Sequence, residues 1–312
     1  MGGYGGILAH RPLLLDVDRC EAFRQAMRSV VRPGDTVLDV GAGTGILSLF
    51  AVEAGARRVY AVERTRIAAM ARTLIEANGA ADRIDVLECD VEAADLPETV
   101  DVIVSEWMGG AAVDEHMLAP VLLARDRWLK PGGAMVPASV EVMLAPAWDE
   151  ALNREVHFFS GWPYGLDLGA VAEFTAEEFF RGSHHVRAHD LRAAGVPVWT
   201  IDAARHDRAD AEGPFKASTS FRANQTGYMN CCAAWFSATL APGTRVDNAP
   251  NSRTHWGRCV FPLTRPVPIE RGCSIDVQLE LELFRPGWCE GSWSVSVAGG
   301  GAEHHDSRSA RW

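Results

Sequence analysis

The stretch TVLDVGAGTG, residues 36–45, decides the fold. Its first half, Thr36–Val40, is a short apolar run that predicts a buried strand, and the glycines that follow predict a tight turn. Leu47–Ala54 then has the composition of a helix. Glycines in such a turn let the backbone approach a ligand, and the N–H groups at the start of the helix face that ligand. The stretch therefore predicts a strand, a ligand-binding turn and a helix.

The sequence on both sides of this stretch alternates helical and strand patterns. A helix is predicted at Asp18–Val31, and strands are predicted at Arg58–Glu63, Ile84–Leu87 and Val100–Ser105. Lys130-Pro131-Gly132-Gly133 predicts a turn before a further strand. This alternation is typical of βαβ units on a parallel sheet, so the first half is predicted to be an α/β, Rossmann-like domain.

The pattern changes after about Pro137. Ser274–Phe284 alternates apolar and polar residues strictly, and Tyr228–Leu240 and Trp293–Val297 also read as strands. These patterns predict an antiparallel, barrel-like sheet domain. The aromatic segment 157–174 matches neither period, which leaves an arm or a lid as alternatives. We therefore expect three parts, divided as a helical cap at 1–32, a Rossmann-like domain at 33–138 and a β-barrel-like domain at 139–312.

Composition limits the classes of function. The 312 residues are 47% apolar and 23% charged, which is typical of a soluble globular protein, and no apolar run approaches the ~18–20 residues of a membrane span. The net charge of −11 argues against nucleic-acid or membrane partners. Seven scattered cysteines without metal-ligand spacing predict reduced thiols, no metal site and a cytoplasmic protein. The strong preference for arginine over lysine suggests a bacterial source.

The glycine turn and the next strand together suggest a nucleotide-type ligand. Ile46 breaks the dinucleotide fingerprint, because the third glycine comes one residue early. Glu63 ends the next strand, where a carboxylate could accept both hydroxyls of a ribose. The whole set resembles the pattern of S-adenosylmethionine-dependent methyltransferases. The alternative is a structural turn beside a solvent-exposed glutamate.

Two glutamates flank the segment after the strand at 100–105. Glu106 and Glu115 lie beyond the carboxyl end of a parallel strand, where ligands bind in such sheets. Two carboxylates held close together raise each other's pKa unless a cation lies between them, and the planar fork of a guanidinium suits that position. The alternative is an acidic loop that faces solvent.

Four motifs, in order along the chain, resemble one family. The segments 105–109 and 115–118 resemble the "double-E" hairpin of the protein arginine methyltransferases, and Thr254-His255-Trp256 resembles the THW loop of that family. His10–Met27 is similar to its N-terminal helix. Segment 157–167 is similar to the arm through which family members dimerise, which implies a homodimer.

The resemblance implies a set of site residues. Glu106 and Glu115 would clamp the substrate guanidinium, and Asp16 with His255 would join the two domains beside them as a proton relay or a purely structural pair. The cofactor-binding residues implied are His10, Arg19, Gly41, Gly43, Glu63, Val91, Glu92 and Met117. The substrate pocket would contain Tyr4, Leu13 and Trp256. No metal is implied.

Individual roles follow from the same resemblance. Arg19 would pair with the methionyl carboxylate of the cofactor, Glu63 with the ribose hydroxyls and Glu92 with the adenine amino group. Taken singly, Arg19 could be a surface helix residue and Trp256 an ordinary core residue. Leu13 and the triplet 110–112 depart from the family pattern and are expected to face the guanidinium pocket, so substrate size and mono- or dimethylation stay open.

The sequence thus predicts an arginine N-methyltransferase that converts S-adenosylmethionine to S-adenosylhomocysteine. The bacterial composition and the altered pocket favour free L-arginine in a biosynthetic pathway, with arginine in a protein or peptide as the alternative. A methyltransferase for another amine and a non-catalytic cofactor-binding scaffold are further alternatives.

Overall fold

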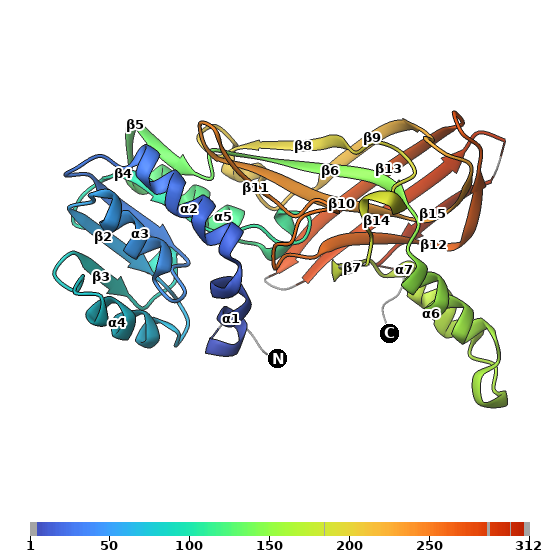
Figure 1. Ribbon diagram of the computed structural model, residues 1–312, viewed down its shortest axis with the longest axis horizontal. Helices are drawn as coiled ribbons and strands as arrows, with labels where there is room; N and C mark the ends of the chain where they lie inside the picture. The colour runs from blue at the N-terminus through green and yellow to red at the C-terminus, as the bar shows by residue number, and fades with distance from the viewer. Residues whose placement is uncertain (1–4, 184, 286–287, 300, 309–312) are drawn as a thin grey trace.

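The computed structural model describes residues 5–183, 185–285, 288–299 and 301–308. Figure 1 shows an α/β half and an elongated β half side by side, with a helical arm that projects from the β half. None of the helices in these ranges is long and apolar enough to span a membrane.

The α/β half contains a five-stranded sheet with the order β3-β2-β1-β4-β5. All of its strand pairs are parallel, as predicted. The strands are β1 (Thr36–Val40), β2 (Arg58–Val62), β3 (Ile84–Leu87), β4 (Val100–Val104) and β5 (Leu129–Val136). Helices α3 (Ile46–Ala54), α4 (Ala68–Ala77) and α5 (Leu118–Trp128) connect them. Every residue of β1 is buried, which explains why the apolar run in the sequence identified this strand so well.

The predicted turn at 130–133 is instead part of a strand. β5 begins at Leu129, which pairs with Val100, and its next paired residue is Ala134, opposite Val102. The four residues between them form a bulge, in which Gly132 has a φ of 76°. A bulge keeps the strand continuous while it accommodates extra residues, so the Pro-Gly signal marks an irregularity rather than the start of the strand.

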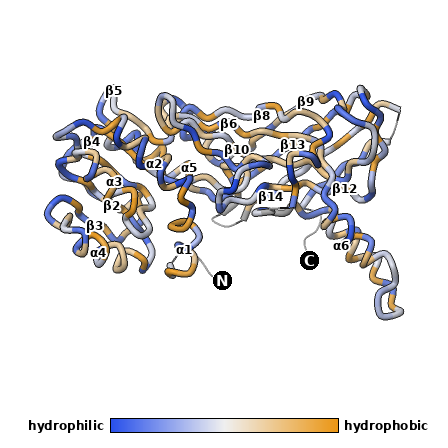
Figure 2. The backbone as a smooth tube through the Cα atoms, in the orientation of Figure 1, coloured by the Kyte–Doolittle hydropathy of each residue, from blue (hydrophilic) through white to orange (hydrophobic). Residues whose placement is uncertain are grey.

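Two helices precede the sheet. α1 (Ile7–Leu15) ends at Asp16, and the same residue caps the N-terminus of α2 (Val17–Val30). Phe23 and Met27 of α2 are fully buried. α1 is largely apolar, as its orange stretches in Figure 2 show. It is also partly exposed, and its Leu8 is 79% accessible.

The β half contains two antiparallel sheets. One has the order β7-β12-β10-β6-β8, with β11 paired to β10, and the other has the order β15-β14-β13-β9. The first comprises β6 (Ser139–Ala147), β7 (Phe180–Ser183), β8 (Val196–Asp202), β10 (Gly227–Ala241), β11 (Thr244–Asp247) and β12 (Arg258–Ile269). The second comprises β9 (Phe215–Arg222), β13 (Ser274–Arg285), β14 (Trp288–Val297) and β15 (Ala302–Asp306).

The alternating pattern of β13 is confirmed by burial. Its apolar residues, Ile275, Val277, Leu279, Leu281 and Leu283, are all buried. Phe261 of β12 meets Trp293 of β14 with ring centroids 5.6 Å apart. The two sheets therefore pack face to face around one core, which agrees with the predicted antiparallel, barrel-like domain.

The segment that matched neither period is an arm. It consists of α6 (Glu150–Ser160), a short turn and α7 (Gly169–Glu177), and Figure 1 shows it extending away from both sheets. Trp162 and Tyr164 at its tip are exposed. The base of the arm is fixed by Asn230, whose side chain accepts from the Asp149 N–H at 2.7 Å and donates to the Asp149 carbonyl at 2.9 Å.

Candidate active site

The glycine turn has the backbone conformation that the sequence suggested. Gly41, Gly43 and Gly45 have φ values of 72°, 56° and 78°, in the left-handed region that side chains disfavour. Gly45 is the N-cap of α3, so the turn ends where the N–H groups of the helix begin. The turn is thus shaped to present backbone groups to a ligand.

Two predicted cofactor-binding residues cover this turn. A Cβ added to Gly43 would lie 2.8 Å from Cε1 of His10, and one added to Gly41 would lie 3.1 Å from Cε of Met117. His10 is buried and comes from α1, whereas Met117 precedes α5. Side chains far apart in the sequence therefore close over a backbone that has room only for glycine.

Glu63 is held in place at the end of β2. It is buried, and its two carboxylate oxygens accept hydrogen bonds from the Gly43 N–H at 2.9 Å and the Thr65 N–H at 2.7 Å. Each oxygen can accept a second hydrogen bond, so binding of ribose hydroxyls is compatible with these contacts. Of the two residues predicted to contact adenine, Val91 is buried and Glu92 is exposed. The role of Glu92 toward adenine stays a prediction.

Arg19 is buried and contacts the first predicted clamp glutamate. Its Nη2 lies 3.3 Å from Oε2 of Glu106, and its Nη1 donates to the Leu13 carbonyl at 3.4 Å. Its Nε is buried and has no hydrogen-bond partner within the described ranges. Buried donors normally have partners, and a guanidinium fork suits a carboxylate. This orphaned donor therefore fits the predicted contact with the methionyl carboxylate of S-adenosylmethionine.

The hairpin after β4 is tightly closed. Oε1 of Glu106 accepts from the Met108 N–H at 3.1 Å, and Gly109 and Ala112 exchange two backbone hydrogen bonds. Ala112 has a φ of 60°, which is uncommon for alanine. Glu115 ends a single 3-10 turn and is half-buried. The structure thus orders both glutamates, while their joint grip on one guanidinium stays a prediction.

Sequence reasoning did not identify Asp114, which holds the tip of the hairpin together. Its buried carboxylate accepts from the N–H groups of Ala111 at 2.8 Å and Gly110 at 3.3 Å. A Cβ on Gly110 would lie 3.2 Å from Sγ of Cys259 in β12. Gly110 therefore packs against the β half, which corrects the expectation that it faces the guanidinium pocket.

Asp16 and His255 lie together and join the two halves. Oδ2 of Asp16 is 2.8 Å from Nδ1 of His255 and accepts from the His255 backbone N–H at 2.7 Å, while Oδ1 accepts from the Arg19 N–H. Burial by itself would raise the pKa of Asp16, but the hydrogen bonds from His255 and Arg19 together hold that pKa below its usual value. Asp16 is therefore an ionised carboxylate that connects α1 and α2 to the THW loop.

Trp256 is a structural anchor in this structure. Its Nε1 donates to the Met108 carbonyl at 2.8 Å, and its ring packs edge-on against Phe236. The side chain thus fixes the hairpin from the core, and its predicted role in the substrate pocket stays a prediction. Leu13 is half-buried and contributes its carbonyl to Arg19, and Tyr4 lies outside the described residues.

Asp39 is a second residue that the sequence analysis did not assign. It is completely buried in β1, directly before the glycine turn, and Oγ of Ser48 donates to its Oδ2 at 2.6 Å. Burial raises the pKa of Asp39 to about 7, against which the bond from Ser48 acts only in part. A carboxyl group beneath the cofactor turn is thus poised to change charge near neutral pH.

This raised pKa predicts a pH-dependent stability. Between pH 3.8, the ordinary pKa of an aspartate, and about pH 7, the folded protein holds the Asp39 proton whereas the unfolded chain releases it. The free energy of unfolding therefore falls as the pH rises through this range. In Asp39→Asn that contribution is absent. We expect the variant to gain stability relative to wild type by about 1 kcal/mol per pH unit from pH 4 to 7, measured by urea unfolding. Parallel pH profiles would contradict this.

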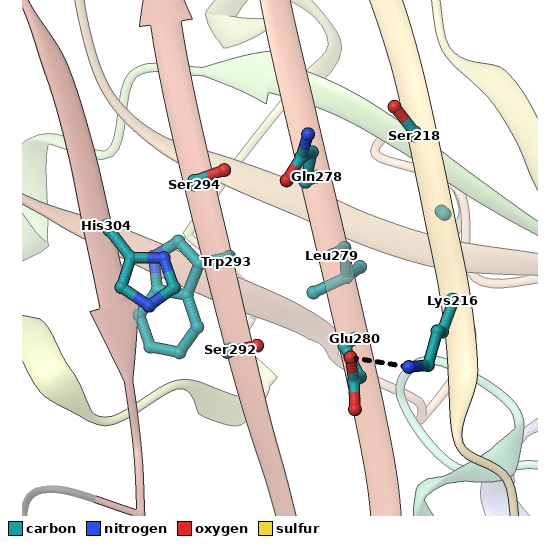
Figure 3. Close-up of a pocket in the computed structure, with 10 residues that line it drawn as sticks. Lys216, Ser218, Gln278, Leu279, Glu280, Ser292, Trp293, Ser294 and His304 are labelled. Atoms are coloured by element: carbon teal, nitrogen blue, oxygen red, sulfur yellow. Dashed lines mark ion pairs between the residues drawn. The ribbon is translucent and has the colours of Figure 1, made fainter.

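A shallow depression of about 300 Å³ lies elsewhere, on the outer face of the second β sheet (Figure 3). Its lining includes Ser218, Gln278 and His304, and Lys216 pairs with Glu280 at 3.2 Å. The strands that form it carry none of the predicted site residues. The chemistry therefore belongs to the carboxyl end of the parallel sheet.

Two family models match the chain. Residues 23–135 match the model described as ribosomal protein L11 methyltransferase (PrmA), and residues 138–285 match the arginine methyltransferase oligomerization subdomain. The first covers the glycine turn and the hairpin, and the second covers the arm and the THW loop.

Curated relatives match over most of their length. The chain is 32% identical to "Protein arginine N-methyltransferase 6" of Xenopus laevis over 313 residues, which cover 95% of this chain and 91% of that protein. It is 33% identical to "Protein arginine N-methyltransferase PRMT10" of Arabidopsis thaliana, covering 88% of this chain and 80% of that one. Both organisms are eukaryotes, so these matches do not support the bacterial source suggested by the composition.

A solved structure is also closely similar. The "Trypanosoma brucei PRMT1 enzyme-prozyme heterotetrameric complex with AdoHcy" superposes with a TM-score of 0.89 at 27% identity, covering 98% of this chain and 99% of that chain. The similarity therefore extends over both halves and the arm.

Proposed function

The chain belongs to the protein arginine N-methyltransferase family and is an S-adenosylmethionine-dependent arginine methyltransferase, and on this premise we propose that it methylates arginine in proteins or peptides. The methyl group passes to a terminal guanidino nitrogen, and S-adenosylhomocysteine is the other product. The observation that carries the proposal is the hairpin with Glu106 and Glu115, ordered beside the cofactor turn and in contact with buried Arg19.

The comparisons favour arginine in a protein or peptide over free L-arginine as the substrate. The relatives are named as protein arginine methyltransferases and a histone-arginine methyltransferase. The preference for free L-arginine depended on a bacterial composition and on altered pocket residues. The relatives named are eukaryotic, and Gly110 packs against Cys259, so both supports are weakened.

The chemical problem is the charge on the substrate. An arginine guanidinium has a pKa above ~12 and is protonated at cellular pH, whereas the reacting nitrogen must supply an electron pair. Bound S-adenosylmethionine supplies an electrophilic methyl group on its sulfonium centre. Glu106 and Glu115 would draw positive charge toward the nitrogens that they hold and leave the remaining terminal nitrogen more electron-rich. They would also offset the repulsion between the two cations and align the nitrogen for in-line attack.

The ion pair between Arg19 and Glu106 links the two binding steps. In this structure the two side chains neutralise each other at 3.3 Å. A methionyl carboxylate that engages Arg19 would compete for the same guanidinium and leave Glu106 available to the substrate. His255, held by Asp16, is the candidate proton acceptor, and its orientation depends on that carboxylate.

We propose that two copies associate through the arm and act in the cytoplasm. The exposed aromatic residues at the arm tip and the match to the oligomerization subdomain support a homodimer.

We also propose the three-part division of the chain at 1–32, 33–138 and 139–312, and the end of β5 at Val136 and the start of β6 at Ser139 support its second boundary.

One assay tests the substrate class. The protein is incubated with methyl-labelled S-adenosylmethionine and an arginine-rich peptide, the same peptide with lysine at every arginine, or free L-arginine, and products are identified by mass. We expect label in the arginine peptide alone. Label in free arginine alone would show that free L-arginine is the substrate. Label in the lysine peptide would indicate another amine nucleophile, and no label would favour a non-catalytic cofactor-binding scaffold.

A further inference from the structure

Asn248 lies between β11 and the THW loop and has no role in the mechanism described so far. We propose that it is a positioning residue for the methyl transfer, because one carboxamide holds the Glu106–Glu115 hairpin against the loop that carries His255. The inference rests on the proposed function of that hairpin.

The three hydrogen bonds of the Asn248 side chain carry the inference. Its Oδ1 accepts from the Phe236 N–H at 2.7 Å, and its Nδ2 donates to the Gly110 carbonyl at 2.9 Å and the Gly257 carbonyl at 2.6 Å. The side chain is completely buried. Both amide hydrogens are therefore used, and the opposite orientation of the amide would place its oxygen against two carbonyl oxygens.

These partners belong to three separate elements. Phe236 is in β10, Gly110 is at the tip of the hairpin, and Gly257 directly follows Trp256 of the THW loop. Gly110 is 138 residues away from Asn248 in the sequence. The side chain therefore fixes a distance that neither half of the protein could set by itself.

Asn248 is itself held rigidly. Its backbone N–H donates to the Phe236 carbonyl at 3.3 Å. The next residue, Ala249, donates its N–H to Asp247 at 3.0 Å, and its carbonyl accepts from Nη2 of buried Arg258 at 2.6 Å. A group that is fixed on both sides can transmit a defined position to the hairpin.

A second tether leaves the hairpin attached when the first is removed. Nε1 of Trp256 holds the Met108 carbonyl at 2.8 Å, near Glu106, whereas Asn248 holds the tip between the two glutamates. Loss of Asn248 is therefore expected to displace the tip and Glu115 without unfolding the segment. Small misplacements of catalytic groups are costly, since ~1 Å can reduce rates by about 10²-fold.

The test uses Asn248→Leu, which is similar in shape, and Asn248→Asp, which keeps the acceptor for Phe236 but loses both donors. The matched control is Trp293→Phe, because Trp293 is also buried in the β half and its Nε1 donates to a backbone carbonyl, that of Pro262, at 2.6 Å, a hydrogen bond in which neither the hairpin nor the arm takes part. All variants are assayed with the arginine-rich peptide at a temperature below their unfolding transitions.

We expect both Asn248 variants to lower kcat by about tenfold to a hundredfold, with the KM for S-adenosylmethionine within about threefold of wild type. The control loses thermal stability to a similar extent but keeps kcat within about threefold. Wild-type kcat in Asn248→Asp, or an equal loss of kcat in the control, would overturn the positioning role.

Hydrogen exchange of the hairpin gives a readout that does not depend on activity. The N–H groups of Gly109 and Ala112 bond to each other's carbonyls, so their exchange rates report closure of the tip. We expect faster exchange in Asn248→Leu and unchanged exchange in Trp293→Phe. Unchanged exchange in both would overturn the inference, whereas a wild-type protein that does not methylate arginine would overturn the proposed function and leave the exchange result intact.

Discussion

Glu106→Gln is expected to lower the turnover of arginine methylation by about two to three orders of magnitude, while the dissociation constant of S-adenosylmethionine stays within about tenfold of wild type. The variant keeps an oxygen that can accept from the Met108 N–H but loses the charge that polarises the substrate guanidinium. Binding of the cofactor should not be weakened, because Glu106 competes with the cofactor carboxylate for Arg19 and is not itself a ligand of the cofactor. Single-turnover kinetics and calorimetry separate these two effects.

Glu115→Gln is expected to show a loss of the same order, since the two carboxylates share one substrate cation. Glu98→Gln provides the control, because Glu98 is a partly exposed carboxylate that pairs with Arg57 at 2.8 Å. Its turnover should match wild type, as exposed pairs contribute little. Turnover at the wild-type level in Glu106→Gln or Glu115→Gln would remove the clamp from the mechanism.

Arg19→Met is expected to weaken S-adenosylmethionine binding by about tenfold to a hundredfold, the usual worth of a hydrogen bond to a charged group. Methionine retains the aliphatic part of the side chain but lacks the guanidinium group, whose carbon lies 5.6 Å from the ring centroid of Phe23. The loss should therefore come from the missing positive charge. Calorimetric titration measures it directly.

A second ligand separates this loss from a general disturbance of the site. 5′-Methylthioadenosine has the adenosine and sulfur of the cofactor but no carboxylate, so wild type and Arg19→Met should bind it with similar affinity. Equal weakening of both ligands would show that Arg19 acts through the fold, for example through its contact with Glu106, rather than on the carboxylate.

Local patterns predicted the elements that are fixed by local physics. The strand at 36–40 is bounded by a Pro-Gly turn and by glycines, and every one of its residues is buried, so its limits matched β1. The alternation in β13 likewise identified its buried face. The bulge at 130–133 could not be predicted, because it is defined by pairing with β4, some thirty residues earlier in the chain.

Site residues could be predicted where the residue type and its motif indicate a chemical role. They could not be predicted where the role depends on a tertiary contact. Asp114 and Asn248 act only through buried backbone groups that the fold brings to them. The ion pair of Arg19 with Glu106 joins residues 87 apart, and the family resemblance had assigned each of them to a ligand. Under the proposed assignments, this ion pair would place the cofactor subsite directly beside the substrate subsite.

Asp16 has a consequence for how the protein can be divided. One carboxylate ends α1, begins α2 and receives His255 from the distant half, so the segment that places His10 over the glycine turn is secured from outside its own domain. A fragment ending near residue 138 would contain the turn, the helices and the hairpin, but it would lack the His255 contact to Asp16. The placement of His10 over the cofactor turn is thus coupled to a loop of the β half.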